Sequence, residues 1–204
     1  MLISTPEIMH YVEIIGYVGL AVVIFVETGL FFGFVLPGDS LFFISGMLAA
    51  KGYFNVWILA FVFFSTAVLG YFFGYWFGDK LGGWLQKRPE SIFYRRRYLE
   101  AAKQFYQKHG AKTVVLARIV PVVRTFAPIV SGMVKMPYIQ FAVYNILGAF
   151  LWVTSFTLGG YFLGTRYPLI MDYFLPISVG IILLSILPGV YAFIRNRLKP
   201  SNSN

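Results

Sequence analysis

The sequence predicts an all-α polytopic membrane protein with a single membrane domain over residues 1–204. Hydrophobic residues make up 58% of the chain and charged residues only 12%, whereas soluble domains carry about 25% charged residues. Several apolar stretches reach the roughly 20 residues that a helix needs to span a bilayer, and two others are interrupted by proline. We therefore expect two inverted-topology repeats, each a re-entrant helical hairpin followed by a transmembrane helix, and then a C-terminal transmembrane helix.

The first hairpin is predicted over residues 14–50, a hydrophobic stretch too long for one helix and cut at Pro37-Gly38. The second is predicted over residues 113–134, where Pro121 and Pro128 interrupt the apolar run. A proline inside a helix removes a backbone hydrogen bond and costs about 3 kcal/mol. Broken backbone at membrane depth persists only where protein or a watery cavity covers it. We therefore expect Pro37, Gly38, Pro121 and Pro128 to break the two re-entrant hairpins.

Three uninterrupted apolar stretches are predicted to cross the membrane, at residues 54–78, 138–164 and 169–194. The first of them completes a repeat over residues 14–78, and the second completes a repeat over residues 113–164. The third is the C-terminal transmembrane helix.

Short sequence matches support the repeat. "VLPGDSLFFISGML" (35–48) and "IVPVVRTFAPIVSGMV" (119–134) each contain a proline, a charged residue and Ser-Gly-Met. Downstream, "LGYFFG" (69–74) echoes "LGGYFLG" (158–164). Inverted repeats with broken helices are typical of secondary transporters, whose substrate site lies near the bilayer midplane.

The basic residues predict the orientation. The loop over residues 79–112 holds nine of the 17 lysines and arginines, and the positive-inside rule places it and the basic C-terminus in the cytoplasm. Lys135, directly after the second hairpin, keeps that hairpin on the cytoplasmic side, so the first should enter from the opposite face. The first dozen residues contain no lysine or arginine, which fits an external start and predicts no secretory leader.

Within this loop, Tyr94, Tyr98, Ala102, Phe105 and His109 fall at helical spacing, with basic residues around the other side. That pattern predicts an amphipathic helix lying in the headgroup region. Nucleic-acid binding is a competing interpretation of a chain with net charge +9. Because positive-inside topology already requires the basic cluster, we expect no nucleic-acid partner.

Four charged residues lie inside the predicted hairpins: Glu27 and Asp39 in the first, Arg118 and Arg124 in the second. Overlaying the two halves places Glu27 opposite Arg118 and Asp39 opposite Arg124. A charge at the bilayer centre costs about 2.5–3.5 kcal/mol, so the four must meet one another, water or a charged ligand. One interpretation is a pair of structural salt bridges. The other is a functional site that needs both signs of charge.

The functional interpretation assigns Arg118 and Arg124 to substrate binding, because a planar guanidinium group holds phosphate well. Nearby acids weaken anion binding when ionised and permit it when protonated, which assigns Glu27 and Asp39 to gating or proton coupling. Asn145, within a predicted span, either bridges two helices or lines the pathway. The chain has no cysteine and only two histidines, so we expect neither a metal nor a cofactor.

These motifs resemble the DedA family of bacterial inner-membrane proteins, also called the SNARE-associated or VTT-domain family. The resemblance rests on E-x(9)-P-G-D at residues 27–39, on "RIVPVVRTFAPIVSG" at residues 118–132 and on "NILGAFLW" at residues 145–152. It covers roughly residues 15–165 of the chain.

The resemblance implies lipid translocation in the bacterial cytoplasmic membrane, with undecaprenyl phosphate or phosphatidylethanolamine as cargo and with dependence on the proton motive force. It also implies that the two acids and two arginines are required. The expected partners are therefore an anionic lipid and protons, and we expect no enzymatic activity.

Other functions stay open: a phospholipid flippase or scramblase, a proton-coupled small-ion antiporter, and an enzyme such as a membrane pyrophosphatase. The enzyme is disfavoured because the hydrophobic segments contain no histidine nucleophile. The sequence does not tell which lipid is carried, the net direction of transport, the coupling ion and its stoichiometry, or the oligomeric state.

Overall fold

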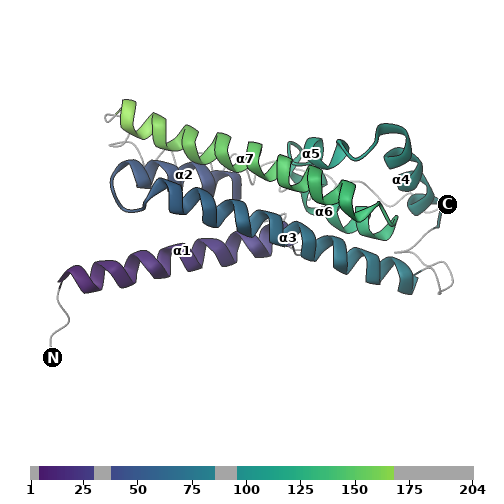
Figure 1. The fold of residues 1–204 in the computed structure, drawn as a ribbon, viewed down its shortest axis with the longest axis horizontal. Coiled ribbons are helices and arrows are strands. Elements are labelled where there is room, and N and C mark those ends of the chain that lie inside the picture. The colour runs from purple at the N-terminus through teal and green to yellow at the C-terminus, as the bar shows by residue number, and fades with distance from the viewer. Residues whose placement is uncertain (1–4, 30–37, 86–95, 168–204) are drawn as a thin grey trace, which may run out of the picture.

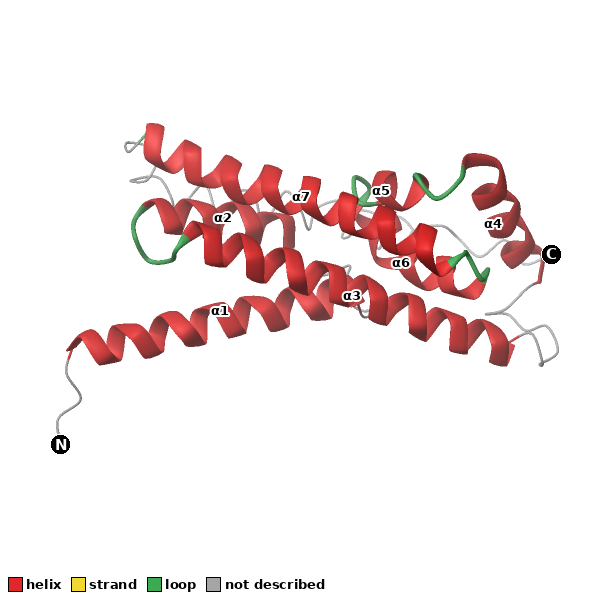
Figure 2. Cartoon of the chain, in the orientation of Figure 1, coloured by secondary structure: helices red, strands yellow, loops and turns green. Residues whose placement is uncertain are grey.

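The computed structural model describes residues 5–29, 38–85 and 96–167. These residues form helices joined by short connections and include no strand, which confirms the predicted all-α class for this part of the chain. Figure 2 shows the helices and loops. In chain order the helices are α1 (Thr5–Gly29), α2 (Gly38–Ala50), α3 (Val56–Leu85), α4 (Arg96–His109), α5 (Thr113–Ala117), α6 (Pro121–Met133) and α7 (Tyr138–Arg166).

Helices α3 and α7 are the long elements of the fold and are apolar enough to cross a membrane. They contain 30 and 29 residues, which gives each a length of about 44 Å at 1.5 Å per residue. A bilayer with its headgroups is about 40–45 Å thick. Helix α3 continues past the predicted end at Gly78 to Leu85, so part of the predicted loop is helical. The predicted C-terminal span, residues 169–194, lies outside the described residues.

The shorter helices occupy opposite halves of the long ones (Figure 1). Helices α1 and α2 lie toward the end of the molecule where α3 begins, whereas α5 and α6 lie toward the end where α7 begins. The main packing crosses between the halves, because α2 packs chiefly against α7 and α6 packs chiefly against α3. Helix α7 therefore covers α2, which precedes α3 in the chain. Helix α3 covers α6, which precedes α7.

The two crossed interfaces share the same close approach at their Ser-Gly-Met segments. A side chain at Gly46 of α2 would collide with the backbone carbonyl of Thr157 in α7. A side chain at Gly132 of α6 would collide in the same way with the backbone carbonyl of Tyr75 in α3. Small residues allow helix backbones to approach in this way in membrane proteins.

Each long helix also contributes a glycine to the same close contact. A side chain at Gly160 of α7 would collide with the carbonyl of Phe43, and one at Gly78 of α3 would collide with the carbonyl of Ile129. The contacts therefore align Gly78 with Gly160, which differs from the expected match of residues 69–74 with 158–164. Both helices are rich in glycine and aromatic residues, so their sequences match at more than one offset.

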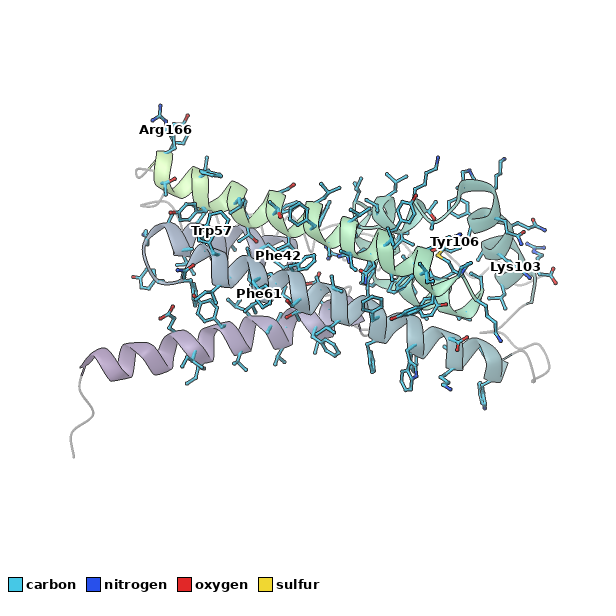
Figure 3. The ribbon with its side chains drawn as sticks, in the orientation of Figure 1. Phe42, Trp57, Phe61, Lys103, Tyr106 and Arg166 are labelled. Atoms are coloured by element: carbon cyan, nitrogen blue, oxygen red, sulfur yellow. The ribbon has the colours of Figure 1, made fainter. Side chains whose placement is uncertain are left out.

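Apolar side chains lie both inside the helix bundle and on its outer faces. Figure 3 labels Phe42, which is buried between α2 and the long helices, and Trp57 and Phe61, which are each 71% exposed on α3. A helix that is hydrophobic all round is typical of a membrane span. The buried core between α1, α2, α3 and α7 contains Ile24, Phe42, Ala49, Val56, Leu59, Phe63, Ala67, Ala149 and Val153.

Candidate functional site

A buried ion pair joins the two predicted hairpins. Arg124, in the first turns of α6, donates through Nη2 to Oε1 of Glu27, near the end of α1. Glu27 is 1% exposed and Arg124 is 5% exposed. This contact joins the first acid of the first predicted hairpin to the second arginine of the second predicted hairpin. Removing one partner of such a pair is strongly destabilising, because the other charge stays buried.

Arg118 lies at the end of α5 and is also buried. Its Nη2 donates to Oδ1 of Asn145 at 2.7 Å, and its Cζ lies 3.9 Å from the centroid of the Tyr71 ring. A guanidinium group over an aromatic face is attracted by the negative face of the ring. Arg118 is thus held from two sides, by an amide of α7 and by a ring of α3.

Asn145 connects three helices. It is fully buried, accepts from Arg118 and donates through Nδ2 to the backbone carbonyl of Val68 at 3.1 Å. The amide therefore ties α7 to α3 and orients Arg118 at the same time.

Tyr71 belongs to this site, although nothing in the sequence pattern predicted it. It lies at the centre of α3, about 21–23 Å from either end of that helix at 1.5 Å per residue, and it is fully buried. Its hydroxyl donates to the backbone carbonyl of Arg124 at 3.0 Å, while its ring lies beneath Arg118. Tyrosines of membrane proteins are enriched at the interfaces. The available signal was the position of this tyrosine in the middle of a span.

Two prolines shape the second hairpin differently. Pro121 is the first residue of α6, and Val120 before it is extended, with φ −103° and ψ 111°, because a residue preceding proline disfavours the α conformation. This change of direction separates α5 from α6. Pro128 was also expected to break the hairpin, and that prediction is wrong, because α6 continues through it to Met133. The ring of Pro128 fits against Gly74 of α3, where a side chain would come within 3.1 Å of Cγ.

The first hairpin is described in part. Gly38 is the first residue of α2, and Asp39 lies in its first turn. The side chain of Asp39 lies outside the described part of the structure, and Pro37 lies outside it entirely. Buried hydroxyl groups accompany the charged residues on the helices around the site, at Thr28, Ser40, Ser45, Thr125 and Ser131. Within the described ranges, no three metal-ligating side chains of His, Cys, Asp or Glu lie together.

Helix α4 lies outside this centre and contacts it through α6. Tyr106 donates to the carbonyl of Ala127 at 3.4 Å, and burial raises the pKa of its phenol. Phe105 and His109, expected on the apolar face, contact each other with ring centroids 4.5 Å apart and are exposed. Lys103, labelled with Tyr106 in Figure 3, is exposed on the same helix. The basic side of α4 thus faces away from the bundle.

Comparisons with known proteins cover most of the chain. The VTT domain model matches residues 36–162. Protein DedA of Escherichia coli (strain K12) is 44% identical over 197 residues, which is 93% of this chain and 90% of that protein. An uncharacterized membrane protein of Mycobacterium leprae is 40% identical, over 84% of this chain and 76% of its own length. Inner membrane protein YqjA of Escherichia coli (strain K12) is 31% identical, over 77% of this chain and 71% of its own length. No solved structure matches the chain.

Proposed function

The chain belongs to the VTT-domain (DedA) family of membrane proteins, and on this premise we propose that it moves undecaprenyl phosphate or a related anionic lipid across the bacterial cytoplasmic membrane. Transport depends on the proton motive force. The protein acts as a carrier and not as an enzyme, since moving a lipid between leaflets makes and breaks no covalent bond.

The proposed topology is a pair of inverted repeats. Helices α1 and α2 form a re-entrant hairpin from one face, and α5 and α6 form another from the opposite face. Two observations support it: the hairpins lie at opposite ends of the long helices (Figure 1), and the two crossed interfaces repeat the same glycine contacts. Basic side chains on α4 then lie in the cytoplasm, and the charged site lies near the bilayer midplane, as in secondary transporters of this design.

The buried pair of Glu27 and Arg124, joined to Arg118 through Tyr71, is the observation that supports anion transport. Arginine binds phosphate through a planar fork of donors. A lipid phosphate that reaches this site competes with the Glu27 carboxylate for Arg124. The acyl or prenyl tails remain in the bilayer, next to the apolar outer faces of the long helices.

Competition between carboxylate and phosphate gives a route to proton coupling. When Glu27 is protonated it no longer carries the charge that repels an incoming phosphate. A proton and an anionic headgroup therefore bind together, and loss of the proton expels the headgroup. Asp39, on the same hairpin, is the second acid proposed for this step.

The test is transbilayer movement of labelled lipid in liposomes that contain the purified protein. We expect undecaprenyl phosphate to move faster than phosphatidylethanolamine, and faster still with a pH gradient. The Arg118→Ala variant should lose this activity. The matched control is Arg166→Ala, because Arg166 is exposed at the end of α7 and should be dispensable.

The alternatives give other outcomes in the same liposomes. Equal movement of both lipids, independent of the gradient, indicates a scramblase and contradicts the proposal. Movement of neither lipid, together with ion-dependent proton flux in liposomes that lack polyprenyl lipid, indicates an ion antiporter.

A further inference from the structure

A proline inside α6 removes a backbone donor at the site. In an α-helix, each carbonyl accepts from the N–H four residues later, and for Arg124 that residue is Pro128. Proline has no N–H, so this helical hydrogen bond cannot form. A buried carbonyl needs a replacement donor. The hydroxyl of Tyr71, on the neighbouring helix α3, donates to this carbonyl at 3.0 Å.

The packing of α3 on α6 places this replacement donor. Gly74, one turn after Tyr71, lies against the ring of Pro128, and a side chain there would come within 3.1 Å of Cγ. The proline that removes the donor and the tyrosine that supplies another thus belong to one contact. Tyr71 is fully buried, so water does not compete for its hydroxyl.

The ring of the same side chain holds the other arginine. The Cζ atom of Arg118 lies 3.9 Å from the centroid of the Tyr71 ring. One residue therefore fixes the backbone that carries Arg124 and the guanidinium group of Arg118. These two arginines lie at the end of α5 and in α6, on either side of the change of direction at Val120.

We propose that Tyr71 is a positioning residue of the anionic-lipid site, which compensates for Pro128 and keeps the two arginines in a fixed relation to each other. This inference rests on the proposed function. It does not make Tyr71 a ligand of the lipid: its hydroxyl acts through the turn of α6 and its ring acts through Arg118.

A double-mutant cycle tests the link to the proline. Tyr71→Phe keeps the ring and removes the hydroxyl. Pro128→Ala restores an N–H that can bond to the carbonyl of Arg124. The readout is the affinity of the detergent-solubilised protein for undecaprenyl phosphate. We expect Tyr71→Phe to weaken binding about tenfold in the native background and about twofold or less in the Pro128→Ala background.

The ring is tested by the order of three side chains at position 71. Affinity should fall from Tyr to Phe to Leu, because Phe keeps the aromatic face under Arg118 and Leu does not. Tyr161→Phe is the matched control, since Tyr161 is a half-buried tyrosine of α7, and it should bind like the wild type. Unfolding temperatures measured alongside separate a change in affinity from a loss of fold.

The results test the positioning role of Tyr71 and the proposed transport separately. Equal losses in affinity from Tyr71→Phe in both backgrounds overturn the inference. Coupling between Tyr71→Phe and Pro128→Ala in the unfolding temperature, with none in the affinity, also overturns it. Lipid binding with the expected cycle but no lipid movement in liposomes rejects the proposed transport and leaves the positioning role standing. A wild type that binds no undecaprenyl phosphate overturns both.

Discussion

The α2–α7 interface and the α6–α3 interface follow the same plan but carry different side chains at two places. In α6, Pro128 stands four residues before Gly132, the glycine of the close contact. In α2, the residue four before Gly46 is Phe42, which is 3% exposed and packs in the apolar core. One interface thus has a proline, and a backbone carbonyl that accepts from the Tyr71 side chain, where the other has a phenyl ring.

The long helices differ in the same way. In α3, Tyr71 stands seven residues before Gly78, and in α7 the residue seven before Gly160 is Val153. The Tyr71 hydroxyl donates to a backbone carbonyl of α6, and its ring lies beneath the guanidinium group of Arg118. Val153 belongs to the apolar core. Close backbone contact is therefore a shared structural requirement. At the two matched places, the α6–α3 interface has Pro128 and Tyr71, and the α2–α7 interface has Phe42 and Val153.

The largest effect should come from breaking the ion pair between the halves. Glu27→Ala leaves Arg124 without this partner and should lower the free energy of unfolding by about 3–5 kcal/mol. Lipid transport should be lost, because the acid proposed to bind the coupling proton is gone. Chemical denaturation in detergent measures the first effect, with Glu100→Ala on the exposed side of α4 as control. Unchanged stability in Glu27→Ala would show that the pair is dispensable for the fold.

Substituting the two contact glycines should cost nearly as much and should affect both interfaces alike. Gly46→Val and Gly132→Val each force backbones apart, which we expect to destabilise the fold by about 3 kcal/mol. Gly159→Val is the control, because a side chain at Gly159 meets nothing within 4 Å. The measurement is the yield and unfolding temperature of purified protein. If one glycine tolerates valine and the other does not, the two interfaces are not equivalent in packing.

A smaller effect should distinguish the two interfaces by function. Asn145→Leu removes the amide that holds Arg118, a loss of about 2 kcal/mol for a hydrogen bond to a charged group, and lipid transport should fall by at least tenfold. Thr157→Val, in the α7 face that contacts Gly46, should leave transport within twofold. Initial rates of lipid movement in liposomes give the comparison. Equal loss from both variants would remove the functional distinction.

The smallest effect should appear at Tyr106, outside the crossed interfaces. Tyr106→Phe loses a long hydrogen bond and should cost about 1 kcal/mol or less. Because burial raises the pKa of this phenol, its neutral form is favoured in the folded state. Its contribution is fully present below the ordinary tyrosine pKa of about 10 and is lost as the pH rises above it. Unfolding temperatures between pH 8 and pH 11 should therefore fall less steeply in Tyr106→Phe than in the wild type.

Charged residues were the part of the site that the sequence could predict. Glu27, Arg118 and Arg124 stand out because a charge in an apolar stretch is costly and needs a partner. Tyr71 did not stand out, because tyrosine is common at membrane interfaces and nothing local marks it as a donor to another helix. Its role depends on Pro128, whose missing N–H matters only where α3 lies against it.

The fold too was predictable from the sequence in part. Prolines, hydrophobic length and basic loops predict helices, their approximate bounds and the all-α class. The Ser-Gly-Met match also located the short-helix side of each close contact, at Gly46 and Gly132. On the long helices, the sequence match of residues 69–74 with 158–164 differs from the match that the contacts give, Gly78 with Gly160. Repeated glycines and aromatic residues allow several alignments of these helices, and backbone contact selects one of them.

Competition between phosphate and Glu27 for Arg124 can be measured directly. Binding of undecaprenyl phosphate to the purified protein would be compared between the wild type and Glu27→Gln, across pH 5 to 8. Glutamine removes the charge and keeps a hydrogen-bonding side chain. We expect Glu27→Gln to bind about tenfold more tightly than the wild type at pH 8, and this advantage should shrink as the pH falls towards 5. Weaker binding by Glu27→Gln than by the wild type at every pH would contradict competition for Arg124.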